Sequence, residues 1–310
     1  MGDKIIIASK SDRLKRLITL YGAQDIALMC HDAMDRDIFT KMTCGLIGRE
    51  IYYLEGVKRL MPIAKDAILK ADGSGLSYPS GCVWLAENLA GAKGRMEREW
   101  WAPSGGVYLC VAIYPTLCRE LWSFYSLGIG VAIAQVLGEW GVTAHVRWIN
   151  DILAGGKKVA GTLTEVIRCP GSGEDYMLFG IGLNVNTESF PGHLAQASSL
   201  AMLTGRVWPA LELTAHILSR AGIIFATLHR WEQSGIGLEP GDMGENPVLR
   251  AFRLITDTIG RRCSYGLDAD NRPEFTATAK GVAEDGGLIL VLDDEDEIRV
   301  NTGEIRYLDQ

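Results

Sequence analysis

Apolar and polar positions along the first 240 residues predict a mixed set of strands and helices. Strands are expected where short apolar runs are rich in β-branched and aromatic residues, at 51–54, 81–86, 107–114, 145–148 and 177–185. A hairpin is expected over 151–166, and helices are expected over 61–69, 121–140 and 208–231. The opening segment mixes both charge signs and shows helical patterns at 12–21 and around 25–42.

The pattern changes after a linker that carries proline and glycine, residues 234–247. Four short strands are expected beyond the linker, at 262–266, 274–283, 287–292 and 297–300. A glycine turn at 285–287 and an acidic loop at 293–297 separate the later strands. Short strands with turn signals at this spacing predict a small β-barrel.

Composition narrows the class of protein to a globular enzyme. The 310 residues are 47% hydrophobic and 22% charged, which is typical of a soluble globular enzyme. The net charge of -7 argues against a protein whose main function is to bind nucleic acid or anionic lipid. The seven cysteines are scattered without a C-x-x-C pair and the five histidines lack ligand spacing, so we expect reduced thiols and no metal site.

One stretch, residues 121–138, carries no charge and reaches the lower length of a membrane span. Serine, glutamine and glycine residues interrupt it and a glutamate bounds each end, so a buried helix is the favoured interpretation. The N-terminus has no apolar core long enough for a signal peptide, and the protein is expected in the cytoplasm.

The first segment with candidate chemistry is a loop rich in glycine and basic residues, 86–100. Its donors for phosphate or carboxylate are Lys93, Arg95 and Arg98. Gly94 allows close approach of a ligand to the backbone, and the Trp100 ring could stack on an adenine. The alternative is a solvated basic loop that Glu97 and Glu99 neutralise.

A second segment places Asp151 and Lys158 on opposite arms of the expected hairpin. If Gly155-Gly156 is a two-residue turn, both side chains lie on one face as a diagonal pair, roughly 7–8 Å apart, which leaves room for a ligand between them. In the alternative interpretation Asp151 caps a strand end and Lys158 is a solvated hairpin residue.

A third segment is the apolar strand around Gly180 and Gly182, followed by Asn184. Alternating glycines in a strand usually mean that another backbone or a ligand lies against it, although core packing explains them equally well. No third glycine opens a helix here, so a dinucleotide-binding fingerprint is not supported.

Taken in order, these segments resemble the biotin protein ligase family. The matching positions are Arg147-Trp148-Ile149-Asn150-Asp151, Lys158-Val159-Ala160-Gly161, Gly180-Ile181-Gly182-Leu183-Asn184-Val185, Gly286-Gly287-Leu288-Ile289-Leu290 and Thr302-Gly303-Glu304-Ile305. The nucleotide loop of the family resembles residues 92–100, with Glu97 where the family has glycine. Leu89 takes the place of a glutamine that holds the biotin ring, and residues 54–58 have no counterpart of the family's upstream acid-binding motif.

The resemblance implies an α+β fold with a mixed, largely antiparallel sheet flanked by helices, related to class II synthetases, and a C-terminal SH3-like β-barrel. The implied domains are an N-terminal extension at 1–50, a catalytic ligase domain at 51–240 and the small barrel at 241–310. The implied function is an ATP- and Mg²⁺-dependent ligase that forms an acyl-adenylate, biotinyl-5'-AMP, and transfers the acyl group to a lysine of a biotin carboxyl carrier protein. The resemblance also allows a homodimer.

The resemblance assigns roles to particular residues. Lys158 would bind the acid carboxylate and the phosphate, and Arg95 would bind the α-phosphate. Arg98 would order the loop and Trp100 would lie near the adenine. Asp151 would orient the acceptor amine or take its proton. The further ligand-binding positions expected are Lys93, Gly94, Asn150, Gly161, Gly182 and Asn184.

Two other functions stay open from the sequence. The same chemistry could act on lipoate, octanoate or another small acid, because Leu89 offers an apolar wall and no hydrogen bond for a ureido ring. The chain could also be a non-catalytic ligand-binding or regulatory homologue. DNA binding is not expected, because residues 1–50 show no helix-turn-helix pattern.

Overall fold

The computed structural model describes residues 2–30, 36–37, 40, 47–237, 244–269 and 271–308, with side chains from residue 9 onward. These residues form two compact units, Met1–Thr116 with Val159–Ala226, and Leu117–Lys158 with Thr227–Gln310. Three short 3-10 helices are also present, η1 (Arg95–Glu97), η2 (Arg119–Leu121) and η3 (Gly192–Leu194).

The first unit is built on a mixed sheet with the strand order β1-β2-β3-β7-β6. The strands are β1 (Ile51–Leu54), β2 (Cys82–Ala86), β3 (Val107–Ile113), β7 (Asp175–Leu183) and β6 (Lys157–Arg168). β1 and β2 run parallel, and the other neighbours are antiparallel. All seven residues of β3 are buried, as its unbroken apolar run predicts. The mixed sheet with flanking helices confirms the coarse fold class expected from the sequence.

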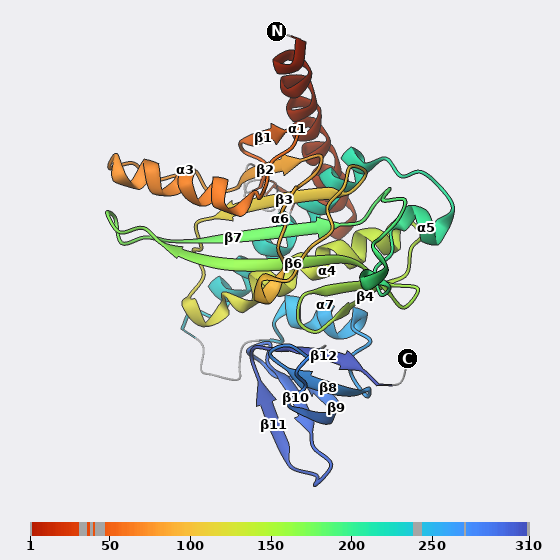
Figure 1. Cartoon of the computed structure of the whole chain (residues 1–310). Helices are drawn as coiled ribbons and strands as arrows, with labels where there is room; N and C mark the ends of the chain where they lie inside the picture. Colours follow the sequence, from red (N-terminus) through yellow and green to blue (C-terminus); the bar gives the residue numbers. More distant parts are fainter. Residues whose placement is uncertain are drawn as a thin grey trace. The chain divides into compact units, whose positions relative to one another are not determined.

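Helix α3 (Met61–Gly73) lies against this sheet (Figure 1). Its first turn carries Pro62, where the missing backbone donor costs nothing. Ala64 and Ile68 are fully buried, and they join Trp84 and Cys110 in the core of the unit. This core supports the strand ends from which the functional loops leave.

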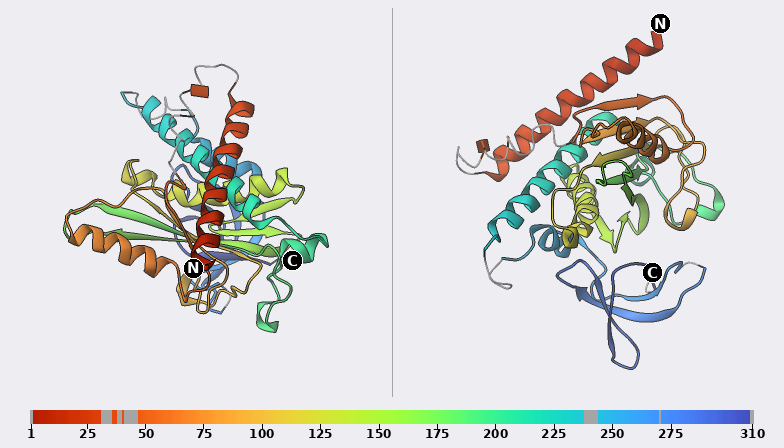
Figure 2. Two further views of the ribbon diagram at one scale, coloured as in Figure 1. Left: turned by 90° about the horizontal axis from the view of Figure 1, so that it is seen from above. Right: turned by 90° about the vertical axis from the view of Figure 1, so that its left-hand side faces the viewer.

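Helix α1 (Gly2–Met29) packs against the first part of α6 (Ala210–Ser234) (Figure 2). Between them the buried carboxylate of Asp25 accepts hydrogen bonds of 3.0 and 2.9 Å from Arg220, and it lies 3.3 Å from Nε2 of His216. The His216 ring stacks on Tyr21 with a centroid distance of 4.4 Å. The apolar cluster beside this network consists of Ile26, Cys30, Ile223 and Ala226.

The expectation of two separate helical patches in residues 12–42 is wrong as far as the described residues reach, because α1 continues without a break to Met29. Gly22, which lies between the two expected patches, allows α1 to approach α6 closely: a Cβ there would lie 3.1 Å from Oγ of Ser219. Most of the second expected helix beyond residue 30 lies outside the described residues.

The second unit contains α4 (Ser123–Glu139), the strands β4 (Ala144–Arg147) and β5 (Asp151–Ala154), α7 (Pro247–Ile255) and the C-terminal sheet. Two helical stretches, Arg119–Glu139 and Ala210–Ser234, are long and apolar enough to cross a membrane. However, 67% and 78% of their apolar windows are buried inside the protein, as in core helices. The short α5 (Leu200–Thr204) belongs to the first unit.

The C-terminal sheet is antiparallel, with the strand order β11-β10-β9-β8-β12 (blue in Figure 1). Its strands are β8 (Arg262–Gly266), β9 (Phe275–Val282), β10 (Leu288–Val291), β11 (Glu297–Val300) and β12 (Glu304–Tyr307). The first four coincide with the predicted strands to within a residue or two. β12 and α7 were missed, although Asn246 gives the helix a recognisable start: its side chain accepts hydrogen bonds from the amides of Val248 and Leu249.

Replacing Asp25 with alanine is expected to lower the free energy of unfolding by roughly 3–5 kcal/mol, because the buried Arg220 guanidinium would lose its counter-charge. Burial opposes ionisation of Asp25, yet hydrogen bonds from His216 and Arg220 hold its pKa below the usual value. The stabilisation is therefore present at neutral pH and is lost as the pH falls below about 4. Urea unfolding of wild type and variant at several pH values measures this difference.

The matched control is Arg13→Ala, which removes an exposed partner of Glu212 from the same pair of helices. Its cost should not exceed about 1 kcal/mol. Equal losses in the two variants, or an Asp25→Ala loss that persists at low pH, would contradict the assignment.

Candidate active site

A two-residue turn connects β5 to β6 and brings charged side chains together. Gly155 and Gly156 have φ angles of 54° and 72°, the left-handed conformation that a tight hairpin turn requires and that glycine adopts without strain. The predicted turn is therefore confirmed. Asp151 opens β5, directly opposite Arg147 at the end of β4, and Lys158 lies just after the turn.

Asp151 binds both cations through separate carboxylate oxygens. Oδ2 accepts a hydrogen bond of 2.6 Å from Nη2 of Arg147, and Oδ1 lies 2.5 Å from Nζ of Lys158. The side chains of Arg147 and Asp151 are only 6% and 14% exposed, so this charge cluster is largely shielded from water. The open gap expected between Asp151 and Lys158 is wrong, because the two flexible side chains meet directly.

This contact fixes the protonation state of Asp151. Burial alone would raise the pKa of the carboxyl, but the charges of Lys158 and Arg147 and their hydrogen bonds hold it well below its usual range. Asp151 is consequently an anion at neutral pH and a very weak base. Arg147 was not among the predicted site residues, although its place in the matched Arg-Trp-Ile-Asn-Asp segment was the available signal.

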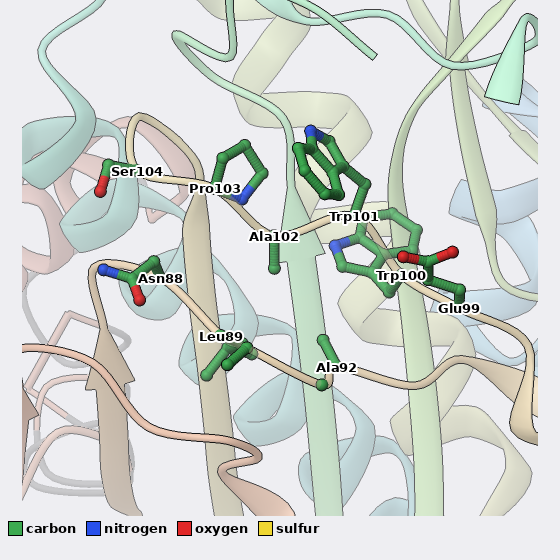
Figure 3. Close-up of a pocket in the computed structure, with 11 residues that line it drawn as sticks. Asn88, Leu89, Ala92, Glu99, Trp100, Trp101, Ala102, Pro103 and Ser104 are labelled. Atoms are coloured by element: carbon green, nitrogen blue, oxygen red, sulfur yellow. The ribbon is translucent and has the colours of Figure 1, made fainter. Parts of the chain in front are cut away.

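The basic loop folds back on itself in the first unit and forms a pocket of about 340 Å³ (Figure 3). Residues 88–92 form one wall and residues 99–104 form the other. Backbone hydrogen bonds join the walls: Leu89 N–H donates to Ala102 O, and Trp100 N–H donates to Ala92 O. The lining of the pocket is divided almost evenly between polar and apolar surface.

The predicted phosphate-binding residues lie at the turn of this loop. Gly94 N–H donates to Arg98 O, Arg98 N–H donates to Arg95 O, and Lys93 pairs with Glu99 as an isolated bridge. Arg95 and Arg98 are half-buried, whereas Lys93 is exposed. The loop therefore brings together the basic residues that the sequence singled out.

Glu97 stands where the family pattern has glycine, and the backbone shows why glycine suits this position. Met96 and Glu97 have φ angles of 53° and 57°, a conformation that disfavours residues with a Cβ. The Glu97 carboxylate lies 3.5 Å from Nη2 of Arg59, which partly balances its charge.

Trp100 lies over β7 at Gly182, and this contact explains one of the two glycines in that strand. A Cβ at Gly182 would lie 2.5 Å from Cε2 of the Trp100 ring, closer than any side chain tolerates. Gly161 of β6 is directly opposite Gly182 in the sheet. Gly180 faces Met61 instead: a Cβ at Gly180 would lie 2.8 Å from the Met61 sulfur, so this glycine serves core packing.

Two predicted ligand-binding residues lie elsewhere. Asn184 is 2% exposed, and its side-chain amide donates to the carbonyl of Ser198, which gives it a packing role after β7. Asn150 lies in the turn between β4 and β5, next to Asp151. The structure thus groups the predicted residues into a charged hairpin in the second unit and a basic loop in the first.

Comparisons with known proteins identify the family of this chain. Residues 65–186 match the model of the biotin/lipoate A/B protein ligase family, and residues 258–306 match the biotin protein ligase C-terminal domain. A Mycobacterium tuberculosis biotin--[acetyl-CoA-carboxylase] ligase is 31% identical over 217 residues, 68% of this chain and 73% of that protein. The chain therefore belongs to the biotin/lipoate A/B protein ligase family.

Other relatives match over less of their length. The bifunctional ligase/repressor BirA of Bacillus spizizenii is 31% identical over 145 residues, and the alignment spans 45% of this chain and 44% of that protein. Among solved structures, the Aquifex aeolicus biotin protein ligase in complex with biotin and ATP superposes with a TM-score of 0.60 at 20% identity, covering 84% of this chain and 99% of that one. This likeness supports the fold.

A Gly182→Ala substitution is expected to displace the Trp100 ring and to cost about 1–3 kcal/mol of stability, because the added methyl group overlaps the indole. Urea unfolding measures the cost. The control is Gly281→Ala in β9, where a Cβ meets no atom within 4 Å, so its effect should stay within about 0.5 kcal/mol. Equal effects of the two substitutions would refute the close contact.

Proposed function

We propose that this chain is an ATP-dependent ligase that activates biotin as biotinyl-5'-AMP and transfers the biotinyl group to a lysine of a biotin carboxyl carrier protein. The observation that carries the proposal is the Arg147–Asp151–Lys158 cluster, which lies in the matched signature and within a chain that aligns with 73% of a biotin--[acetyl-CoA-carboxylase] ligase. The resemblance of residues 92–100 to the nucleotide loop of the family adds Arg95 and Arg98 as phosphate-binding residues.

In the first step the carboxylate of the acid attacks the α-phosphorus of ATP, the bond to the β-phosphate oxygen breaks, and pyrophosphate leaves. Both reactants are anions, so their approach requires fixed positive charge. Lys158 would bind the acid carboxylate and the α-phosphate, and Arg95 would bind the α-phosphate. Mg²⁺ would arrive with ATP and would offset part of the phosphate charge, and no protein ligand is assigned to it.

Lys158 has a counter-ion before the nucleotide arrives, because its ammonium contacts Asp151. This contact holds the long lysine side chain in one place and reduces the entropy lost when the substrates bind. Arg147 keeps its own hydrogen bond to Asp151 and so retains the carboxylate when Lys158 turns to the substrate anions.

In the second step the amine of the carrier lysine attacks the acyl carbon, the acyl–phosphate bond breaks and AMP leaves. The low pKa of Asp151 supports an orienting role over proton abstraction. Asp151 would accept a hydrogen bond from the incoming amine, and the proton would pass to water. Trp100, held over Gly182, would flank the adenine, with Lys93, Gly94 and Arg98 along the phosphates.

An aliphatic acid is a second candidate substrate, because Leu89 forms part of the pocket wall. Leu89, which occupies the position of the family's ring-binding glutamine, lines the pocket with Ala92 and Ala102. Residues 55–57 offer no hydroxyl group beside it, and Gly56 lies against the side chain of Asn88. An aliphatic acid such as lipoate or octanoate suits these surfaces, with the same adenylate chemistry.

The remaining parts of the proposal concern the surroundings of the site. We infer that the five C-terminal strands close into an SH3-like barrel, that residues 1–50, 51–240 and 241–310 act as extension, ligase domain and barrel, and that the reaction takes place in the cytoplasm. The engagement of α1 with α6 through Asp25 supports a structural role for the N-terminal extension in place of DNA binding. A homodimer stays a prediction.

Replacing Lys158 with alanine should lower the rate of adenylate formation at least 10²-fold, because two anions would then meet without their shared cation. ATP–pyrophosphate exchange with biotin measures this step. The control is Lys157→Ala, since neighbouring strand residues point to opposite faces of the sheet. Undiminished exchange in Lys158→Ala would refute the assigned role.

The acid itself is identified by incubating the chain with ATP, Mg²⁺ and, separately, biotin, lipoate and octanoate, and by detecting the acyl-adenylates by mass spectrometry. Biotinyl-5'-AMP is the expected product. An adenylate formed from an aliphatic acid alone would replace biotin with the second candidate. No adenylate from any acid would overturn the proposed reaction.

A further inference from the structure

Residues 256–258, which follow helix α7, hold the strand and turn that lead into Asp151. Thr256 Oγ1 donates a hydrogen bond of 2.8 Å to the carbonyl of Val146, and the backbone N–H of Trp148 donates to Thr258 Oγ1 at 3.2 Å. The indole N–H of Trp148 donates to the carbonyl of Gly286 at 3.1 Å. All these residues belong to the second unit, so the hairpin and the C-terminal sheet share one compact body.

Tyr307 of β12 lies at the end of this chain of hydrogen bonds. Its hydroxyl donates to Asp257 at 2.7 Å and lies 2.8 Å from Thr258 Oγ1. The Tyr307 hydroxyl uses its one proton in the hydrogen bond to Asp257. The Thr258 hydroxyl therefore donates its hydrogen bond to Tyr307, and it accepts one from the backbone N–H of Trp148. Burial raises the pKa of Tyr307, so the phenol keeps this proton at neutral pH.

The ring of Tyr307 also contacts the cation that holds Asp151. The guanidinium carbon of Arg147 lies 5.8 Å from the centroid of the ring, within the range of a cation–π contact. Arg261 lies closer to the same ring, at 4.3 Å, and pairs with Asp257 at 3.9 Å. Tyr307 is 7% exposed and the Arg147 side chain is 6% exposed, so the contact between these two residues is shielded from water.

We propose that Tyr307 is a positioning residue of the active site, whose ring fixes Arg147 and whose hydroxyl fixes the backbone at Trp148, so that β12 sets the geometry of the Asp151 carboxylate. The proposal rests on the proposed function for the role of Asp151 in acyl transfer. The C-terminal sheet thereby contributes to the second half-reaction through the hairpin.

Acyl transfer requires Arg147 to stay fixed, because Arg147 holds the Asp151 carboxylate. Arg147 and Lys158 both attract the Asp151 carboxylate, and the long lysine side chain has no fixed geometry of its own. When Lys158 engages the substrate anions, Arg147 alone retains the carboxylate. Reactive geometry is sensitive to displacements of about 1 Å, so a loosened Arg147 would misplace Asp151.

The test compares three full-length variants. Tyr307→Leu removes the ring and the hydroxyl, and Tyr307→Phe removes the hydroxyl alone. The matched control is Tyr265→Leu in β8, because Tyr265 is also 7% exposed and its hydroxyl donates to the carbonyl of Thr302, away from Arg147. Thermal unfolding confirms that each variant is folded.

The first readout is the carboxyl ¹³C titration of Asp151 by NMR, assigned with Asp151→Asn, which needs no substrate and no turnover. In wild type and Tyr265→Leu the carboxylate should stay ionised to the lowest pH at which the protein is folded. In Tyr307→Leu the pKa should rise by at least about one unit, because Arg147 is loosened while Lys158 stays. Tyr307→Phe should show a smaller rise.

The second readout separates the two half-reactions with biotin, ATP, Mg²⁺ and a biotin carboxyl carrier domain. Single-turnover transfer from the adenylate should fall roughly tenfold or more in Tyr307→Leu and less in Tyr307→Phe, with adenylate formation changed less than about threefold. Equal loss of both steps, an equal effect of Tyr265→Leu, or a folded Tyr307→Phe identical to wild type in both readouts would overturn the proposal. A wild type that forms no adenylate would refute the proposed function and leave the titration result standing.

Discussion

Asp151 is a buried carboxylate shared by Arg147 and Lys158, and the arrangement of the hairpin depends on this contact. A buried anion is costly unless it is paired and hydrogen-bonded, so at least one of the two cations must stay on the carboxylate. The tight turn at Gly155-Gly156 brings Lys158 close enough to contact Asp151. The same contact that stabilises the hairpin thus positions Lys158 next to an ionised Asp151.

The basic loop is stabilised differently: backbone hydrogen bonds and apolar contacts hold its conformation. Hydrogen bonds between Leu89 and Ala102 and between Trp100 and Ala92 close the loop, and Gly182 leaves room for the indole. The contacts that hold the loop therefore do not depend on the charges of the basic side chains at its turn. The pocket wall at Leu89 and the proposed phosphate-binding residues therefore depend on different contacts.

The sequence predicted the elements whose signals are local. Apolar runs located β1, β2, β3 and β7, and Gly155-Gly156 correctly predicted the hairpin turn that leads into β6. The sequence could not predict contacts that depend on distant partners: the direct meeting of Asp151 with Lys158, the engagement of Asp25 with Arg220, and the place of Tyr307 beside Arg147. Helix α7 was missed although its nine residues are strongly amphipathic and Asn246-Pro247 marks its start, so both local signals for this helix were present in the sequence.

In the proposed reaction Lys158 binds the phosphate of the adenylate while Asp151 faces the acceptor amine. A crystal structure of the full chain with a non-hydrolysable analogue of biotinyl-5'-AMP tests this assignment. The lysine ammonium should lie within hydrogen-bond distance of the analogue's phosphate position, and the carboxylate should stay bound to Arg147 beside the acyl carbon. An analogue bound away from the hairpin, or one whose phosphate position has no contact with Lys158, would contradict the assignment.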